Sequence, residues 1–188
     1  MSEFEGERPL TEIRTGRADY QVYENLMEHL EFENKNDLIA QIREAHVALD
    51  LGSGDGHSAV ALSKFSPNLE EIVGVDATTD VNREVIGELP FRQERTYLNE
   101  FLKGNTTHFD IVLISGVPDH RIRKENYRKL AESVSPEGLV IETGETKLDD
   151  TEMGIYFDKA YTPKRKQMIG FKDAVWKKKI EAIESLTK

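Results

Sequence analysis

The stretch "VALDLGSGDGHSAV", residues Val47–Val60, decides the fold. Its first five residues, Val47–Leu51, form the apolar run typical of a buried strand. The three glycines of Gly52–Gly56 let backbone lie against a ligand where a Cβ would clash. A helix is expected after them, with free N–H groups and its positive dipole end facing the same place. The stretch therefore predicts a strand–loop–helix unit that binds a ligand through its loop.

More strands follow this unit along the chain, and helical patterns separate them. Near-continuous apolar runs of this kind, alternating with helices, predict a parallel sheet that helices cover on both faces. The further runs are "EIVGVD" (Glu71–Asp76), "FRQER" (Phe91–Arg95), "FDIVLIS" (Phe109–Ser115) and "LVIET" (Leu139–Thr143). The last of these comes after the expected turn "SPEG". The sequence thus predicts an α/β fold.

The pattern changes after Gly144. "GIYFDKAY" (154–161) and "KQMIGF" (166–171) flank "TPKR" and predict an antiparallel hairpin. The spacing of Val175, Trp176, Ile180 and Ile183 indicates a closing helix, although 175–179 also fits a strand. We expect one domain over residues 1–188, with N-terminal helices in 1–45, a binding core in 46–143, and the hairpin and helix in 144–188.

Composition narrows the class of protein. The chain has 188 residues, of which 38% are hydrophobic and 32% charged, as in ordinary globular proteins. It contains no cysteine, which excludes disulfides, thiol nucleophiles and cysteine ligands for zinc. No apolar run reaches transmembrane length, and the N-terminus lacks the apolar stretch of a signal peptide. We expect no membrane partner, no metal site and a cytoplasmic location.

Charge is distributed unevenly over the chain. The net charge is −10, yet Lys159–Ile180 holds eight Lys/Arg and one Asp, a local net of +7. Arg121–Lys129 holds five Lys/Arg against one Glu, a net of +4. Solvated helix and strand faces are the preferred interpretation. The alternative is a local site for an anionic acceptor, RNA or an acidic protein.

The residues of the glycine loop discriminate between three classes of cofactor. A P-loop needs a lysine that does not follow Gly56. The dinucleotide fingerprint G-x-G-x-x-G would place its third glycine at His57. Asp55 would also repel a pyrophosphate about 4 Å away, by roughly 1 kcal/mol in water and about 4 kcal/mol near a protein surface. S-adenosylmethionine carries a sulfonium and an ammonium and no phosphate, so it tolerates nearby acids.

Four segments of the chain resemble sequence motifs of a known protein family. "LDLGSGDG" and "IVGVD" resemble motifs I and II of the class I S-adenosylmethionine-dependent methyltransferases. "HFDIVLISGVPDH" resembles the fourth-strand motif of that family, and "LAESVSPEGLVIET" its fifth-strand segment. The resemblance covers 47–143, about half the chain, in the family's order. It implies a Rossmann-like, mostly parallel seven-stranded sheet and S-adenosylmethionine as cofactor.

The same resemblance implies a set of cofactor-binding residues. Asp50 and the backbone of Gly52–Gly56 would hold the methionine end of the cofactor. Asp76 would accept two hydrogen bonds from the ribose, and Ala77 would lie against the adenine. Many members of the family have an acidic residue where this chain has Tyr97. The Tyr97 ring could stack on adenine or belong to the core. The implied set is Asp50, Gly52, Ser53, Gly54, Asp55, Gly56, Asp76, Ala77, Tyr97 and Ser115.

The acceptor should enter above the fourth strand, beside "SGVPDH". Asp119 and His120 are the candidates for a general base or an acceptor contact. The competing interpretation is that Asp119 caps the following helix and His120 is exposed in its first turn. A small-molecule acceptor is slightly preferred. An RNA or protein acceptor docked on the basic segment, or a non-catalytic cofactor-binding or partner subunit, remain alternatives, and the oligomeric state stays open.

Overall fold

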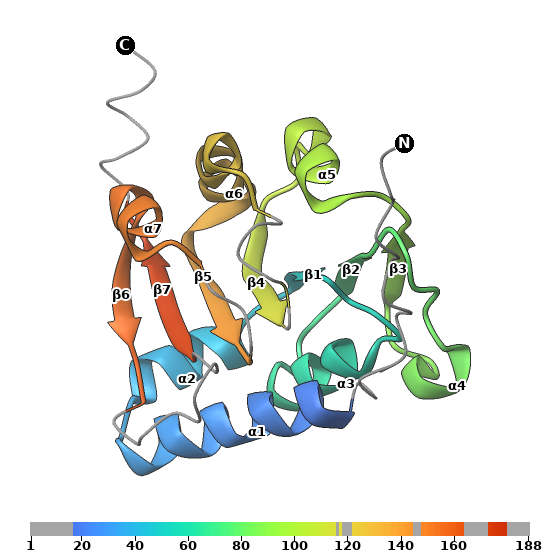
Figure 1. Ribbon diagram of the computed structural model, residues 1–188. Helices are drawn as coiled ribbons and strands as arrows, with labels where there is room; N and C mark the ends of the chain where they lie inside the picture. The colour runs from blue at the N-terminus through green and yellow to red at the C-terminus, as the bar shows by residue number, and fades with distance from the viewer. Residues whose placement is uncertain (1–16, 116, 118–121, 145–147, 164–172, 180–188) are drawn as a thin grey trace, which may run out of the picture.

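A seven-stranded mixed sheet forms the centre of the protein (Figure 1). The computed structural model describes residues 17–115, 117, 122–144, 148–163 and 173–179. The strand order is β3-β2-β1-β4-β5-β7-β6. The first five strands are parallel, and β7 runs antiparallel to both β5 and β6. The strands are β1 Val47–Leu51, β2 Glu71–Val75, β3 Phe91–Glu94, β4 Phe109–Ser115, β5 Val134–Thr143, β6 Phe157–Tyr161 and β7 Ala174–Lys178.

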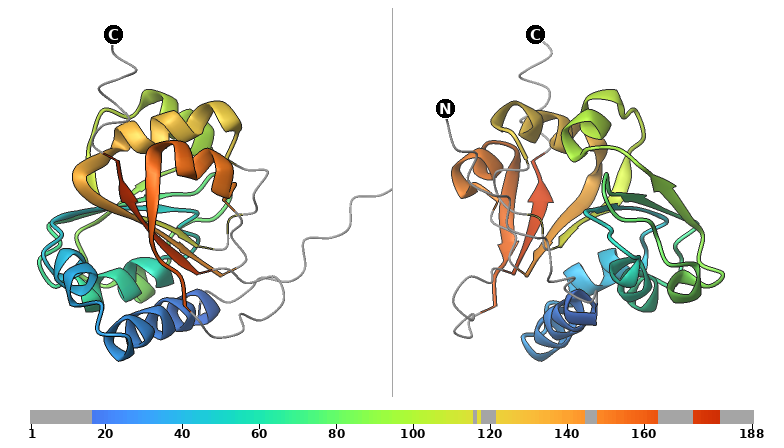
Figure 2. Two further views of the ribbon diagram at one scale, coloured as in Figure 1. Left: turned by 90° about the vertical axis from the view of Figure 1, so that its left-hand side faces the viewer. Right: turned by 45° about the vertical axis from the view of Figure 1, so that its right-hand side comes forward.

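Helices cover both faces of this sheet (Figures 1 and 2). The first group, α1 to α4, lies on one face, and α5, α6 and α7 lie on the other. The helices are α1 Arg17–Phe32, α2 Asn36–Arg43, α3 His57–Phe65, α4 Arg83–Ile86, α5 Leu98–Gly104, α6 Tyr127–Ser133 and α7 Asp150–Tyr156, with a 3-10 turn η2 at Lys124–Asn126. The predicted α/β class, including the antiparallel C-terminal strands, is confirmed.

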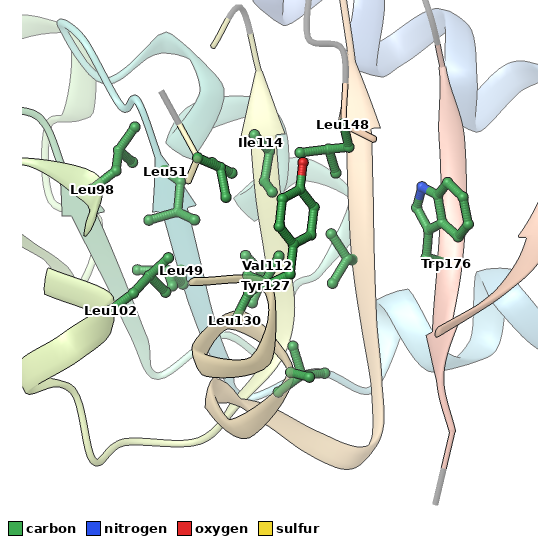
Figure 3. Close-up of a cluster of buried hydrophobic side chains, with 14 of the residues drawn as sticks. Leu49, Leu51, Leu98, Leu102, Val112, Ile114, Tyr127, Leu130, Leu148 and Trp176 are labelled. Atoms are coloured by element: carbon green, nitrogen blue, oxygen red, sulfur yellow. The ribbon is translucent and has the colours of Figure 1, made fainter. Parts of the chain in front are cut away.

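Two apolar clusters hold the helices to the sheet. Alternate residues of a strand point to opposite faces, so Ala48 packs with α1 and α3 while Leu49 faces α5 and α6. Figure 3 shows the cluster on the face of the sheet that α5 and α6 cover, in which Leu102 and Leu130 approach the strands from their helices. Because both faces are covered, each central strand is apolar along most of its length.

The strand order reverses its direction at β1, which pairs with β2 on one side and β4 on the other. In such sheets the loops at the carboxyl ends of the two flanking strands diverge and leave a crevice. The glycine loop follows β1 directly and therefore lies at this crevice.

The prediction that the turn "SPEG" separates the preceding helix from the fifth strand is wrong. β5 already begins at Val134, and its register with β4 shifts between Phe109 and Ile111. Gly138 lies within this irregular stretch, where a Cβ would be 2.8 Å from the Phe109 carbonyl oxygen. The chain thus changes register inside a continuous strand, which local turn residues cannot reveal.

The C-terminal region also differs in part from its prediction. The antiparallel pair exists, but its members are β6 and β7, and α7 occupies residues 154–156 of the first predicted strand. Segment 166–171 lies outside the described residues, as do Ile180 and Ile183 of the predicted closing helix. Val175 and Trp176 belong to a strand, because β7 completes the open edge of β5 and the Trp176 indole N–H bonds the buried Glu142 carboxylate at 3.2 Å.

Candidate functional site

The glycine loop has a backbone that only glycine adopts easily. Gly52, Gly54 and Gly56 have φ of 84°, 51° and 100°, all in the left-handed region. A Cβ on Gly52 would lie 2.5 Å from Val117 Cγ2, and one on Gly56 would lie 2.5 Å from Ile86 Cγ2. A Cβ on Gly54 would meet no atom of the described residues within 4 Å. Packing therefore requires the first and third glycines, whereas the middle one faces open space.

Asp50 lies beneath the loop rather than on its surface. Its side chain is fully buried, and Ser58 in the first turn of α3 donates a hydrogen bond of 2.5 Å to Asp50 Oδ2. The bond ties the end of β1 to the start of the helix. The predicted site did not include Ser58. Its position two residues after Gly56, at the start of the expected helix, is the one feature of the sequence that could have indicated it.

Asp55 contacts its own helix start. The His57 Nδ1 atom lies 2.8 Å from Asp55 Oδ1, and the His57 backbone N–H donates to the same oxygen at 3.4 Å. Both side chains are about one-third exposed. The Asp55 carboxylate thus has a partner within the loop, while keeping a solvent-facing side.

A cavity of about 280 Å³ opens beside the loop at the carboxyl ends of β2 and β3. Four of its lining residues are among those predicted from the sequence: Gly52, Asp76, Ala77 and Tyr97. The prediction lacked Thr78, Leu98 and Asn99, which also line it. Each of these directly follows or nearly follows a predicted residue in the chain.

Asp76 joins the cavity to the glycine loop. Its Oδ2 accepts the Gly54 backbone N–H at 3.3 Å. Its Oδ1 accepts the backbone N–H groups of Thr78 and Thr79, both at 2.8 Å, and the Thr78 hydroxyl at 3.0 Å. Asp76 therefore organises the turn after β2 and presents a carboxylate to the cavity at the same time.

Tyr97 is not a core residue, which removes one of its two predicted roles. It is 64% exposed and stands at the N-cap of α5 on the cavity. Asn99, two residues further, accepts the Asn126 side-chain amide at 2.6 Å and the Arg123 backbone N–H at 3.1 Å. These bonds connect the cavity wall to the segment that follows β4.

Three buried hydroxyls near the carboxyl edge of the sheet have no hydrogen-bond partner among the described residues: Ser53, Ser115 and Thr143. Ser115 and Thr143 are register partners on β4 and β5. Ser53 and Ser115 do not line the described cavity, so their cofactor role stays a prediction. Asp119 and His120 lie outside the described residues.

Asp173 is a further acidic group at this edge, absent from the sequence-based site. It directly precedes β7, and the Gly144 backbone N–H donates to its Oδ1 at 3.2 Å. Burial raises the pKa of Asp173, and the bond from Gly144 opposes that rise. No local pattern singles it out, because only the antiparallel course of β7 brings it beside the end of β5.

Three of the four described lysines of the basic C-terminal segment form ion pairs, and the fourth, Lys178, donates to the Val134 carbonyl. Lys159 lies 2.8 Å from Asp150 and 4.4 Å from the Trp176 ring centroid. Lys177 and Lys179 lie within 3.4 Å of Glu137 and Asp158 respectively. These pairs favour a solvated, ion-paired face for this part of the segment.

The described ranges lack both a metal-ligand cluster and a membrane-spanning helix. Those ranges hold no group of three or more His, Asp or Glu side chains that could bind a metal. No helix within them is long and apolar enough to span a membrane.

Comparison with known proteins connects these features to one fold. No protein-family model matches the chain. The "Uncharacterized methyltransferase YcgJ" of Bacillus subtilis (strain 168) is 48% identical over 42 residues, which are 22% of this chain and 15% of that relative. The match therefore spans only a small part of either protein.

Solved structures match over far more of the chain. The "Putative methyltransferase yhhF from Escherichia coli" superposes with a TM-score of 0.63 at 14% identity, covering 94% of this chain and 90% of that one. The N-methyltransferase NodS from Bradyrhizobium japonicum WM9, in complex with S-adenosyl-L-homocysteine, gives 0.54 at 9% identity, covering 78% and 86%. The chain has the class I methyltransferase fold.

Proposed function

We propose that this protein is an S-adenosylmethionine-dependent methyltransferase. One observation carries the proposal: the Asp76 carboxylate lines a cavity at the switch point of the sheet and accepts a hydrogen bond from the glycine loop. The names of the similar proteins support the same activity.

The residues present fit this cofactor. A cavity of about 280 Å³ is near the lower limit for ligand pockets, about 300 Å³, and suits the adenosine part of the molecule. Asp76 and Asp55 are compatible with a cationic, phosphate-free ligand. The open space at Gly54 allows backbone to lie against it, and the exposed ring of Tyr97 offers a surface for adenine.

S-adenosylmethionine supplies a methyl group on a positively charged sulfur, which is already activated for displacement. The protein's main task is to align the acceptor at about 3–3.5 Å, which contributes roughly 7–11 kcal/mol to lowering the barrier. Asp119 and His120 remain our candidates for the base that takes a proton from a hydroxyl or amine acceptor. We favour a small-molecule acceptor, because three of the four described lysines of the basic segment are paired with acidic side chains.

Calorimetric titration with S-adenosylhomocysteine, with NADH as control, tests the cofactor. Micromolar binding of the first ligand alone is the expected result. Binding of NADH with equal affinity, or of neither ligand, would contradict the proposal. Transfer of a radioactive methyl group from S-adenosylmethionine to hydroxyl- and amine-bearing small molecules would then test activity, with bulk RNA and protein as the comparison.

A further inference from the structure

Strand register aligns three polar side chains at the carboxyl edge of the sheet. Ser115 ends β4 and Thr143 ends β5, and the two are register partners. Glu142 pairs with Ala174 in the antiparallel β5–β7 ladder, so the next pair outward is Thr143 and Asp173. Figure 1 shows the start of β7 beside the end of β5. Ser115, Thr143 and Asp173 therefore form one row across three neighbouring strands, which we call the polar row.

The polar row lies on the face of the sheet that α1 covers. Two positions further into each strand stand Leu113, Ile141 and Val175, and all three pack with α1 side chains in one apolar cluster. Side chains two positions apart on a strand point to the same face, so the polar row points to the α1 side as well. The apolar layer under α1 thus ends in a polar layer at the edge of the sheet.

Two members of the polar row are buried hydroxyls. Ser115 is 5% exposed and Thr143 is fully buried, and neither hydroxyl has a hydrogen-bond partner among the described residues. A buried hydroxyl in this state is unfavourable, because it has lost its bonds to water and gained no other. A ligand that forms hydrogen bonds along the polar row would remove this cost.

Asp173 gives the polar row a negative charge. It is partly buried, and the Gly144 backbone N–H donates to its Oδ1 at 3.2 Å. Burial raises the pKa of Asp173, whereas that bond and the charge of His29 on α1 lower it. Because burial disfavours the ionised carboxylate, a cation bound beside it would be stabilising. The polar row therefore suits a ligand with a protonated amine better than a neutral or anionic one.

The polar row begins beside the glycine loop. A Cβ on Gly52 would lie 3.5 Å from the Ser115 carbonyl oxygen. The cavity that suits the adenosine lies on the other side of this loop, at β2 and β3, whereas the polar row crosses β4, β5 and β7. A ligand on the polar row would thus adjoin the cofactor without competing for the adenosine cavity.

We propose that the polar row binds the methyl acceptor, and that this acceptor is a small molecule whose protonated amine is held by Asp173 and Thr143. The inference rests on the proposed function and makes it more specific by naming the acceptor class. Neighbouring strands are about 4.8 Å apart, so the atom that receives the methyl group should lie about 5–10 Å from this amine, toward Ser115 and the glycine loop.

The test uses the full chain saturated with S-adenosylhomocysteine. The probes are small amines that carry a second amino or hydroxyl group about 5–10 Å away. Each probe is paired with two analogues, in which a methyl group or a carboxylate replaces one amine. Saturation-transfer NMR measures binding, and methyl transfer from radioactive S-adenosylmethionine measures turnover. Amines of this panel should bind at least ~10-fold more tightly than both analogues, because the analogues lose a hydrogen bond between charged groups.

Two variants assign this preference to the polar row. Asp173→Asn removes the charge, while its amide oxygen can still accept the Gly144 N–H, so the preference for amines should fall to within about 3-fold. Thr143→Val keeps the shape of the side chain and should weaken amine binding about 5-fold. Asp158→Asn is the control, because Asp158 is an acid on β6 with a 74% exposed side chain, and it should keep the full preference. All three variants should bind S-adenosylhomocysteine as the wild type does.

The outcomes separate this inference from the proposed function. If S-adenosylhomocysteine binds but no amine of the panel does, or if the analogues bind as tightly as the amines, the inference is wrong and the proposed function stands. A preference that survives in folded Asp173→Asn, or that falls equally in Asp158→Asn, also contradicts the inference. If S-adenosylhomocysteine itself fails to bind, the proposed function falls and the inference falls with it.

Discussion

Gly54 provides the sharpest test that the glycine loop lies against a ligand. Its φ of 51° is left-handed, and a Cβ there would meet no atom within 4 Å in the part of the chain that the structure describes. Gly54→Ala should therefore cost only the backbone strain of a left-handed residue, about 1–2 kcal/mol. For a domain of this size that corresponds to a Tm lowered by roughly 2–8 °C. Binding should suffer far more, because the added methyl group would occupy the space we assign to the ligand.

The assay is thermal unfolding together with titration of S-adenosylhomocysteine. We expect Gly54→Ala to remain folded and to bind at least ~100-fold more weakly, equivalent to about 2.7 kcal/mol. Gly87→Ala is the control for strain, because Gly87 has a similar φ of 55° and equally open space for a Cβ among the described residues but lies outside the glycine loop, at the C-cap of α4. This control should lose stability while keeping its affinity within about 3-fold.

The reasoning is refuted if folded Gly54→Ala binds S-adenosylhomocysteine as tightly as the wild type. Open space at this position would then face solvent and not the ligand. An equal loss of affinity in Gly54→Ala and Gly87→Ala would refute it too, because the effect would follow from strain alone.

Three further changes test the structure around the site. Gln93→Ala removes both side-chain hydrogen bonds to the turn after β2, so it should weaken S-adenosylhomocysteine binding about 10-fold and speed hydrogen exchange of that turn. Arg92→Gln on the same strand is the control, and equal affinities in the two variants would count against the role of Gln93. Thr143→Val removes a buried hydroxyl without a partner, so the urea midpoint should stay or rise, and a clear fall would mean that the hydroxyl is used. Ser58→Ala deprives the buried Asp50 carboxylate of a donor and should cost about 1.5–3 kcal/mol in urea unfolding, which an unchanged midpoint would disprove.

Sequence patterns predicted most of the parallel half of the fold. β1, β2, β4 and the core of β5 lie where apolar runs predict them, because burial on both faces demands such runs. Prediction was weaker where pairing partners decide the outcome. Trp176 is in a strand because β5 has an open edge beside it, and that edge is not visible in the local sequence.

The candidate site shows the same division. The resemblance to the methyltransferase family picked out Asp76, Ala77 and Tyr97, and the structure has all three on the cavity at the carboxyl edge of the sheet. Tyr97 could not be assigned to core or cavity, since its exposure depends on how α5 packs. Gln93 carried no signal at all, because its role consists of two bonds to a loop twelve to fourteen residues away.

The sequence by itself determined a parallel α/β architecture and a glycine loop beside an acidic strand end, because strand burial and backbone freedom are local properties of residue types. Only the tertiary structure decided that Gly52 and Gly56 are required by packing while Gly54 faces open space. Only the tertiary structure showed that one oxygen of Asp76 is already occupied. Both facts depend on which atoms meet across the folded chain, and no spacing of residues along the sequence specifies those distances.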